Sequence, residues 1–158
     1  GRRVNQPSSR DTSRIVPARR AVVLATVTSD VIDVESHARL VADAGAGAVV
    51  TFGGIVRDHD GGRGVSGIEY VSHPDAAAVL QAAVEEVVAT RDVEAVACTH
   101  RVGVLSVGDC ALALAVSAAH RYEAFEAASA VVEAVKQKLP VWKRQVFNDG
   151  SHEWVGSA

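Results

Sequence analysis

The sequence predicts a single α+β domain of mixed, largely antiparallel strands with about three helices. The chain has 158 residues, 48 % of them hydrophobic, which suits one domain with a buried core. Runs rich in β-branched residues are interspersed with segments of helical periodicity. Their order lacks the regular strand–helix–strand alternation that builds a parallel sheet. Together these observations favour the α+β class.

The first half of the domain opens with a strand and a helix. AVVLATVT at 21–28 is a β-branched run and predicts a strand. Asp33 can cap a helix over 34–43, because its side chain can accept a hydrogen bond from a free N–H of the first turn. Strands are then expected at 47–57 and 65–72. The glycine pair inside the former indicates a bulge or the close approach of a second backbone.

The second half continues the same mixture. Helical spacing of Ala, Val and Leu predicts a helix over 75–90. Strands are expected at 93–103 and 110–119, a long helix over 120–138 and a hairpin over 141–155. The apolar stripe expected to bury the long helix consists of Phe125, Ala128, Val132, Val135 and Leu139.

Residues 1–20 differ in composition from the rest of the chain. They hold six of its 16 basic residues, all arginines, but only one of its 19 acidic residues. Little in this segment can be buried, so we expect a disordered Arg-rich tail at 1–20 and a folded domain at 21–158. A nucleic-acid-binding arm is the alternative, but the acidic body argues against a nucleic-acid partner.

Bulk properties exclude several classes of protein. No apolar run approaches the roughly 18 residues of a membrane span, so we expect no membrane partner. The two cysteines, Cys98 and Cys110, have neither metal-ligand nor disulfide spacing, and we expect both to be small buried hydrophobes. A reducing, cytoplasmic location is therefore expected.

Basic residues gather near the end of the chain. Five lie between 121 and 144 in a body that is acidic overall, namely Arg121, Lys136, Lys138, Lys143 and Arg144. Such a cluster predicts an anionic ligand, since Arg and Lys form charge-assisted hydrogen bonds with phosphate. His120 and Arg121 stand where a strand ends and a helix begins, a position that favours an anion. Alternatively, Lys136 and Lys138 only complement the dipole of their helix, and the histidine is structural.

The length of the predicted helix constrains any shared site. His120 and Lys136 are 16 residues apart, roughly 24 Å along a helix at 1.5 Å per residue. No small ligand spans that distance within one chain. If both residues serve one site, the start of the helix must come from one subunit and its end from another, and a two-fold dimer is the simplest arrangement.

The motifs of several enzyme classes are missing from the sequence. It contains no GxSxG, GxxxxGK[ST] or HExxH pattern. Its histidines have no spacing with acidic residues that predicts a metal site, so no metal is expected. Lysine remains as the reactive group, because neighbouring cations disfavour its ammonium form and free the amine as a base or nucleophile. Lys136 and Lys143 have such neighbours.

Four segments of the domain stand out together, namely GAVVTFGGIVRDH at 47–59, THRVGVLSVGD at 99–109, SAAHRYEAFEA at 117–127 and VKQKLPVWKRQ at 135–145. In order and spacing they resemble the large subunit of molybdopterin synthase. The resemblance runs from about 21 to 155, essentially the whole domain, and leaves out the arginine-rich tail.

The resemblance implies an α/β-hammerhead fold and a sulfurtransferase of molybdenum cofactor biosynthesis. Members of this family form a homodimer flanked by two copies of a small ubiquitin-like sulfur carrier, giving a heterotetramer. The C-terminal Gly-Gly tail of the carrier bears a thiocarboxylate and enters a pocket of the large subunit. Two sulfurs pass in turn to cyclic pyranopterin monophosphate, which becomes the dithiolene of molybdopterin. No cofactor takes part in this step.

The resemblance also implies roles for individual residues that hold the substrate. Arg57 matches a substrate-binding arginine of the family, and Phe52 lies in the same motif. His120 and Arg121 match a His-Arg pair that holds the phosphate of the substrate from the neighbouring subunit. These four residues are expected to bind substrate.

Two lysines match the residues that the family needs for chemistry. Lys136 matches the lysine closest to the tail of the carrier, and Lys143 matches a second essential lysine, followed by Arg144 at the pocket. Many relatives carry glutamate at the next position, where this chain has Gln145. An amide can hydrogen-bond substrate but cannot accept a proton as a carboxylate does.

Two other interpretations remain open. The first is a non-catalytic relative that binds the small subunit without turnover, for which Gln145 is the only support. The second is a sensor of a phosphate-bearing ligand that uses the same cations. Affinity for a protein with a Gly-Gly tail separates the sensor from the other two interpretations, and product formation separates the enzyme from its non-catalytic relative.

Overall fold

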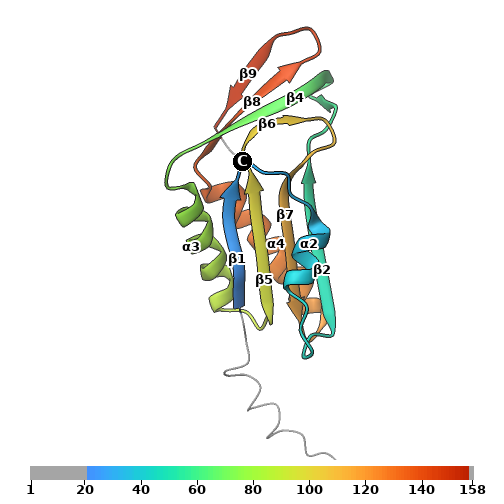
Figure 1. The fold of residues 1–158 in the computed structure, drawn as a ribbon, viewed down its shortest axis with the longest axis vertical. Helices are drawn as coiled ribbons and strands as arrows, with labels where there is room; N and C mark the ends of the chain where they lie inside the picture. The colour runs from blue at the N-terminus through green and yellow to red at the C-terminus, as the bar shows by residue number, and fades with distance from the viewer. Residues whose placement is uncertain (1–20, 157–158) are drawn as a thin grey trace, which may run out of the picture.

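The computed structural model describes residues 21–156, so the expected tail at 1–20 lies outside the described residues. The first of two sheets consists of β1 (Ala21–Thr28), β2 (Ala48–Ile55), β5 (Ala95–Arg101) and β7 (Cys110–Ala118). Its strand order is β1-β5-β7-β2 (Figure 1). β1 is parallel to β5, whereas the other neighbours are antiparallel. The expected α+β class is confirmed.

The position of each strand in this sheet explains its sequence. β5 and β7 are central and almost continuously buried, as expected for apolar runs that are covered on both faces. β2 lies at the edge and alternates between half-buried and exposed residues. The bulge expected at its glycine pair is confirmed, since the pairing register with β7 shifts between Gly54 and Ile55. A Cβ on Gly54 would lie 3.3 Å from the Cβ of Leu112.

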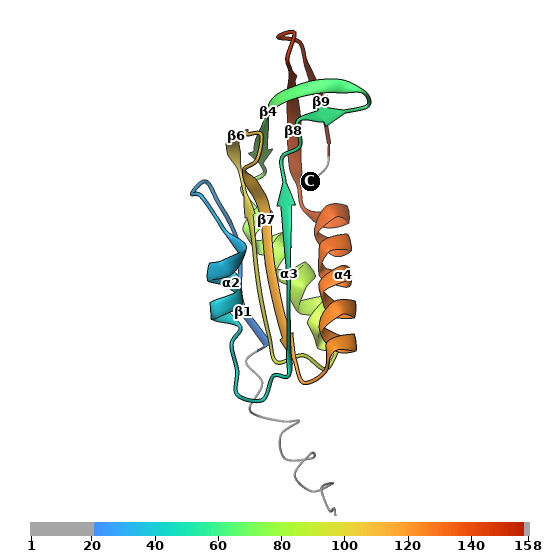
Figure 2. The ribbon, with the colours of Figure 1, turned by 90° about the vertical axis from the view of Figure 1, so that its right-hand side faces the viewer.

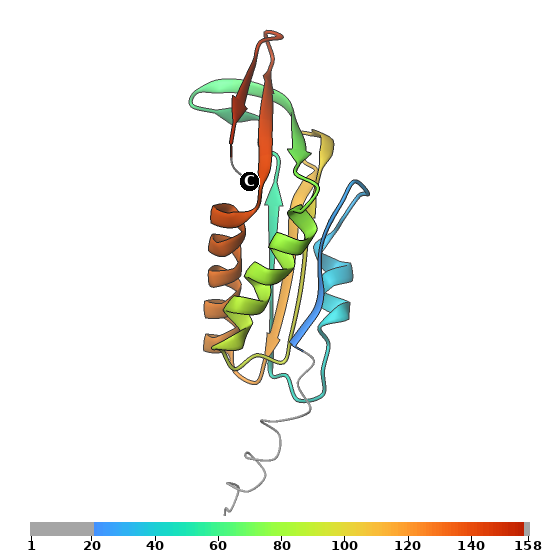
Figure 3. The same cartoon turned by 90° about the vertical axis from the view of Figure 1, so that its left-hand side faces the viewer.

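Helices cover both faces of the first sheet. α3 (Ala76–Ala89) and α4 (Arg121–Lys138) lie on one face, and the short α2 (Val34–Leu40) lies on the other (Figures 2 and 3). Asp33 caps α2 as expected, accepting a hydrogen bond from the N–H of Ser36 at 2.7 Å. Buried His37 anchors α2 to β5, because its Nε2 is 2.7 Å from the hydroxyl of Thr99.

The buried face of α4 differs from the predicted stripe. Ala128 and Val135 are buried as expected, but Phe125 is 62 % exposed, so its predicted burial is wrong. Small residues occupy the inner face instead, and they let the helix lie close to the sheet. The buried residues of α4 are Ala124, Ala127, Ala128, Val131 and Val135.

The second sheet lies beyond one end of the first (Figure 1). It pairs β3 (His59–Asp60) with β4 (Arg63–Ser72), β4 with β8 (Val141–Phe147), and β8 with β9 (His152–Val155). The predicted hairpin over 141–155 is confirmed as β8 and β9. The chain enters this sheet directly after β2 and again directly after α4, so both of these elements end beside it.

The strand expected at 93–103 is shorter in the structure and ends as β5 at Arg101. A separate strand, β6 (Gly103–Ser106), follows and joins the second sheet by pairing with β4. Gly103 has a φ of +97°, a backbone conformation that residues with a Cβ rarely adopt. The chain thus leaves one sheet for the other at this glycine. Neither β6 nor β3 was expected from the sequence.

The hydrophobic core lies between the first sheet and its two longer helices. It includes Val84 from α3, Leu114 from β7 and Val131 from α4, all fully buried. Cys98 is buried as expected, whereas Cys110 is only half-buried. Among the described residues, no helix is both long and apolar enough to span a membrane.

Candidate functional site

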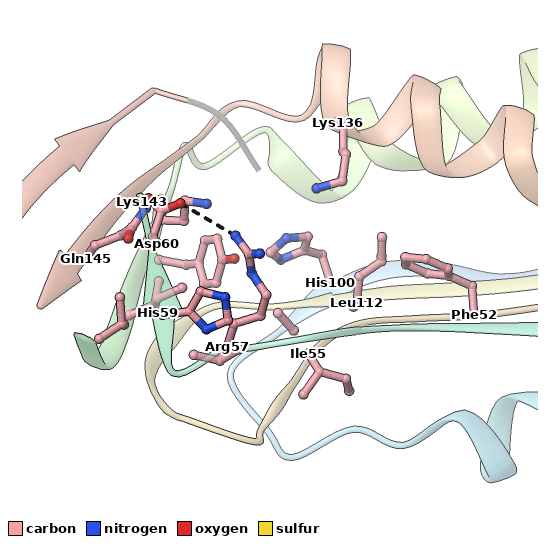
Figure 4. A pocket seen from close by; sticks show the side chains of 16 residues that line it. Phe52, Ile55, Arg57, His59, Asp60, His100, Leu112, Lys136, Lys143 and Gln145 are labelled. Atoms are coloured by element: carbon pink, nitrogen blue, oxygen red, sulfur yellow. Dashed lines mark hydrogen bonds and ion pairs between the residues drawn. The ribbon is translucent and has the colours of Figure 1, made fainter. Parts of the chain in front are cut away.

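A cavity of about 220 Å³ lies where the two sheets meet. The end of β2, the strands β4, β5, β7 and β8, and the last turn of α4 all contribute to its wall. Its floor is apolar, with Phe52 and Leu112 from the first sheet. Its polar lining consists of Arg57, His59, Asp60, Tyr70, His100, Lys136, Lys143 and Gln145 (Figure 4).

Lys136 and Lys143 enter the cavity from neighbouring elements. Lys136 lies in the last turn of α4, and its side chain points down into the cavity (Figure 4). Lys143 lies on β8, just after the chain turns at Pro140. Burial lowers the pKa of Lys143 below its usual range, and the nearby charges of Lys136 and Arg57 lower it further, while Asp60 acts in the opposite direction.

Alternation along β8 divides its polar residues between two faces. Lys143 and Gln145 face the cavity, and Gln145 is buried. Arg144 faces the other way, where its Nε donates a hydrogen bond to the Glu69 carboxylate at 3.0 Å. Its guanidinium also lies 6.0 Å from the centre of the Trp154 ring. Arg144 is therefore not part of the cavity within this chain.

Asp60 is connected to two other residues of the cavity. The Gln145 amide nitrogen donates a hydrogen bond to Asp60 Oδ2 at 3.0 Å. An Arg57 nitrogen lies 3.5 Å from Asp60 Oδ1 (Figure 4). Asp60 reaches this place because the short strand β3 folds back on β4, pairing Asp60 with Arg63.

His100 is a buried neutral histidine at the wall of the cavity. Burial lowers the pKa of its imidazole to about 4, and the charge of Lys136 acts in the same direction. Its Nδ1 is 2.7 Å from the carbonyl oxygen of Arg101, so Nδ1 carries the proton and donates a hydrogen bond to that oxygen. The lone pair of the neutral ring is then on Nε2. Tyr70 packs edge-on against this ring at a centroid distance of 4.9 Å.

The structure brings together five of the eight residues that the sequence predicts for the site, namely Phe52, Arg57, Lys136, Lys143 and Gln145. His120 and Arg121 do not join them. They lie at the other end of α4, and Arg121 precedes Lys136 by 15 residues, about 22 Å of helix. Within one chain, the predicted His-Arg pair and Lys136 therefore lie at opposite ends of α4.

Four polar residues of the cavity were not predicted from the sequence, namely His59, Asp60, Tyr70 and His100. His59 and Asp60 belong to the stretch DHDGGRG, whose glycines indicate only a turn. Asp60 is brought to the cavity by its pairing with Arg63 on β4, and the sequence alone does not show that pairing. His100 follows a run of apolar residues in β5, so it resembles a core histidine until the end of that strand is placed.

The cavity suits an anionic organic ligand. Arg57, Lys136 and Lys143 converge on it, and its apolar floor can receive a flat ring. Within residues 21–156 no group of three or more His, Cys, Asp or Glu side chains is placed to hold a metal ion. The fold and the cavity thus define an α+β protein with a cation-lined cavity where its two sheets meet.

The family of the chain follows from comparison with known proteins. Residues 27–138 match the family described as MoaE protein, and the chain belongs to this family. It is 35 % identical over 131 residues to the molybdopterin synthase catalytic subunit of Bacillus subtilis strain 168, an alignment that covers 82 % of this chain and 83 % of the relative. The resemblance stated from the sequence is confirmed.

Solved structures share the fold. Molybdopterin synthase from Staphylococcus aureus superimposes with a TM-score of 0.76 at 28 % identity, covering 84 % of this chain and 96 % of the other. The complex of subunits 1 and 2 of the molybdopterin-converting factor from Helicobacter pylori 26695 contains a chain of the same fold. Its TM-score is 0.63 at 18 % identity, with 83 % of this chain and 88 % of that chain covered.

Proposed function

We propose that this protein is the catalytic subunit of a molybdopterin synthase. In this reaction, sulfur passes from the thiocarboxylated C-terminus of a small carrier protein to cyclic pyranopterin monophosphate. The observation that carries the proposal is the convergence of Arg57, Lys136 and Lys143 on one cavity, in a chain that belongs to the MoaE family. The relative from Bacillus subtilis has the name of this subunit.

The charges of the cavity suit both reactants. The phosphate of the pterin and the thiocarboxylate are anions, and the attack of sulfur on a pterin carbon develops further negative charge. Cations fixed by α4 and β8 stabilise that charge without reorganisation. Lys143, whose pKa is lowered by burial, gives up a proton more readily than an exposed lysine does. It is therefore suited to proton transfer during the reaction.

A second copy of the chain would complete the cavity. His120 and Arg121 are too far from Lys136 to meet one ligand within a chain. β2 is an edge strand of its sheet, and α4 beside it exposes Tyr122 (71 %) and Phe125 (62 %). A two-fold partner on this side would place its own helix antiparallel to α4. The start of one helix would then lie beside the lysines of the other.

The small carrier protein is the second partner that we propose. A cavity with cations and an apolar floor can receive an extended Gly-Gly tail that ends in an anion. The Helicobacter pylori structure of similar fold is a complex of two subunits of the molybdopterin-converting factor. This likeness and the cations of the cavity support a partner of the same kind for this chain.

Reconstitution tests the proposal. The protein is mixed with a thiocarboxylated carrier and cyclic pyranopterin monophosphate, and molybdopterin is assayed. The wild type should form product, and Lys136→Ala should lose at least about 100-fold in rate. Lys138→Ala is the matched control, because Lys138 lies in the same helical turn but outside the cavity, paired with Glu86. Tail binding without product in the wild type would favour the non-catalytic interpretation and contradict the proposal.

A further inference from the structure

Gln145 places a buried amide beside the carboxylate of Asp60. Gln145 is only 5 % exposed, and its amide nitrogen donates to Asp60 Oδ2 at 3.0 Å. An amide has a donor that a carboxylate lacks, so glutamine at this position can hold an ionised Asp60. The amide and the acid are thus a matched pair that joins β8 to β3.

Asp60 is the only acidic side chain among the described residues that line the cavity. It stands against three cationic side chains, those of Arg57, Lys136 and Lys143. One of its oxygens is 3.5 Å from Arg57, and its charge favours the ammonium form of Lys143. Asp60 therefore acts on two of the three cations while its other oxygen is occupied by Gln145.

A glutamate at position 145 would conflict with this arrangement. Its carboxylate would stand at about the 3.0 Å that now separates the Gln145 amide from Asp60. Two carboxylates at such a distance repel each other, which disfavours the ionisation of both at once. The arrangement therefore favours a single carboxylate, at position 60 or at position 145.

We propose that Asp60, held by the amide of Gln145, is the carboxylate that positions the cations of this cavity. It orients the Arg57 guanidinium and balances the charge of Lys143 before an anionic reactant enters. This inference rests on the proposed function for its effect on turnover, but its effect on Lys143 is a property of the protein alone. The carboxylate of Asp60 then takes the place of the glutamate that many relatives carry at position 145. Gln145 is therefore no longer evidence for lost activity.

A set of four variants tests this inference. Asp60→Asn removes the carboxylate, Gln145→Glu adds a second one, and the double variant D60N/Q145E moves the carboxylate from position 60 to position 145. Asp58→Asn is the matched control, because Asp58 is an exposed acid two residues earlier that does not line the cavity. Thermal unfolding and circular dichroism establish that each variant is folded.

The first readout does not depend on activity. The side-chain ¹³C signals of Lys143 are followed against pH in the protein without reactants. Asp60→Asn should lower the pKa of Lys143, because it removes the one nearby charge that favours the ammonium form. The double variant should return that pKa toward the wild-type value, and Asp58→Asn should leave it unchanged. An unchanged titration of Lys143 in Asp60→Asn would overturn the inference.

The second readout is turnover in the reconstituted reaction. Each single variant should lower kcat roughly tenfold, as expected for the loss of a charge-assisted hydrogen bond. The double variant should recover most of that loss, because an amide and a carboxylate again face each other with their positions exchanged. Additive losses would overturn the inference. If the wild type forms no product while Lys143 responds as expected, the charge arrangement stands and the proposed reaction fails.

Discussion

The charge of Lys136 lowers the pKa of Lys143 across the cavity, adding to the larger effect of burial. The two lysines reach this relationship from different elements, the end of α4 and the strand β8 that follows it. The turn at Pro140 reverses the chain between them. An exposed and a half-buried lysine are thereby held together, an arrangement that disfavours the protonated form of Lys143 and favours the binding of an anion.

This relationship predicts the response of Lys143 to loss of its neighbour. Lys136→Ala removes a like charge, so the pKa of Lys143 should rise toward, without reaching, the value of an exposed lysine, because burial persists. NMR titration of the Lys143 side chain measures the change. Lys138→Ala, which leaves the cavity intact, should not alter it. A fall in the pKa of Lys143 in Lys136→Ala would contradict the described charge arrangement.

The burial of neutral His100 predicts that the folding stability depends on pH. Its pKa is about 4 in the folded protein, below the 6.5 of a free histidine, so the unfolded chain binds more protons between these values. The contribution of neutral His100 to the free energy of unfolding should therefore be fully present above about pH 6.5. It should be lost as the pH drops toward 4, which lowers the free energy of unfolding by on the order of 3 kcal/mol.

His100→Asn isolates this contribution. The asparagine amide can keep the hydrogen bond to the Arg101 carbonyl but does not titrate in this range. Urea unfolding of both proteins at pH 7, 6, 5 and 4 gives the comparison. The slope of unfolding free energy against pH should be shallower in the variant. Equal slopes in the two proteins would show that His100 is already protonated in the folded state or does not titrate as described.

The elements of the fold were predictable where local sequence decides them. The cap at Asp33 and the bulge at Gly54 each depend on a few neighbouring residues, and both are confirmed. Phe125 was placed wrongly, because helical periodicity identifies an apolar stripe but not which side of it meets the sheet. The strand β6 was missed because its partner, β4, is distant in sequence.

The candidate site was predictable in its cations but not in its carboxylate. Clustering of basic residues and the family resemblance indicated Lys136 and Lys143, and both line the cavity. Asp60 lies in a glycine-rich stretch that reads as a turn, and only the folding of β3 onto β4 brings it to Gln145. Interactions between residues 85 positions apart depend on tertiary structure, which no local pattern specifies.

The exposed side chain of Phe125 predicts where two copies of the chain meet. Replacement by lysine adds a charge to the exposed apolar part of α4, which should weaken a dimer that forms beside β2. Since the side chain is already exposed in the single chain, the folding stability should change by no more than about 0.5 kcal/mol. Sedimentation velocity should show a shift toward monomer. Gln81→Lys, on the exposed face of α3, should sediment as the wild type does.

A shared cavity also predicts that two inactive variants restore each other. In Lys136→Ala and in Arg121→Ala, every cavity of a homodimer lacks one essential cation. A dimer of one chain of each kind has one cavity with both defects and one cavity with neither. Half of the dimers in an equal, freely exchanging mixture are of this kind, so about a quarter of wild-type activity should return. Coexpression followed by the reconstituted assay measures it. No recovery, with mixed dimers demonstrated by mass spectrometry, would show that Arg121 and Lys136 do not serve the same cavity from different subunits.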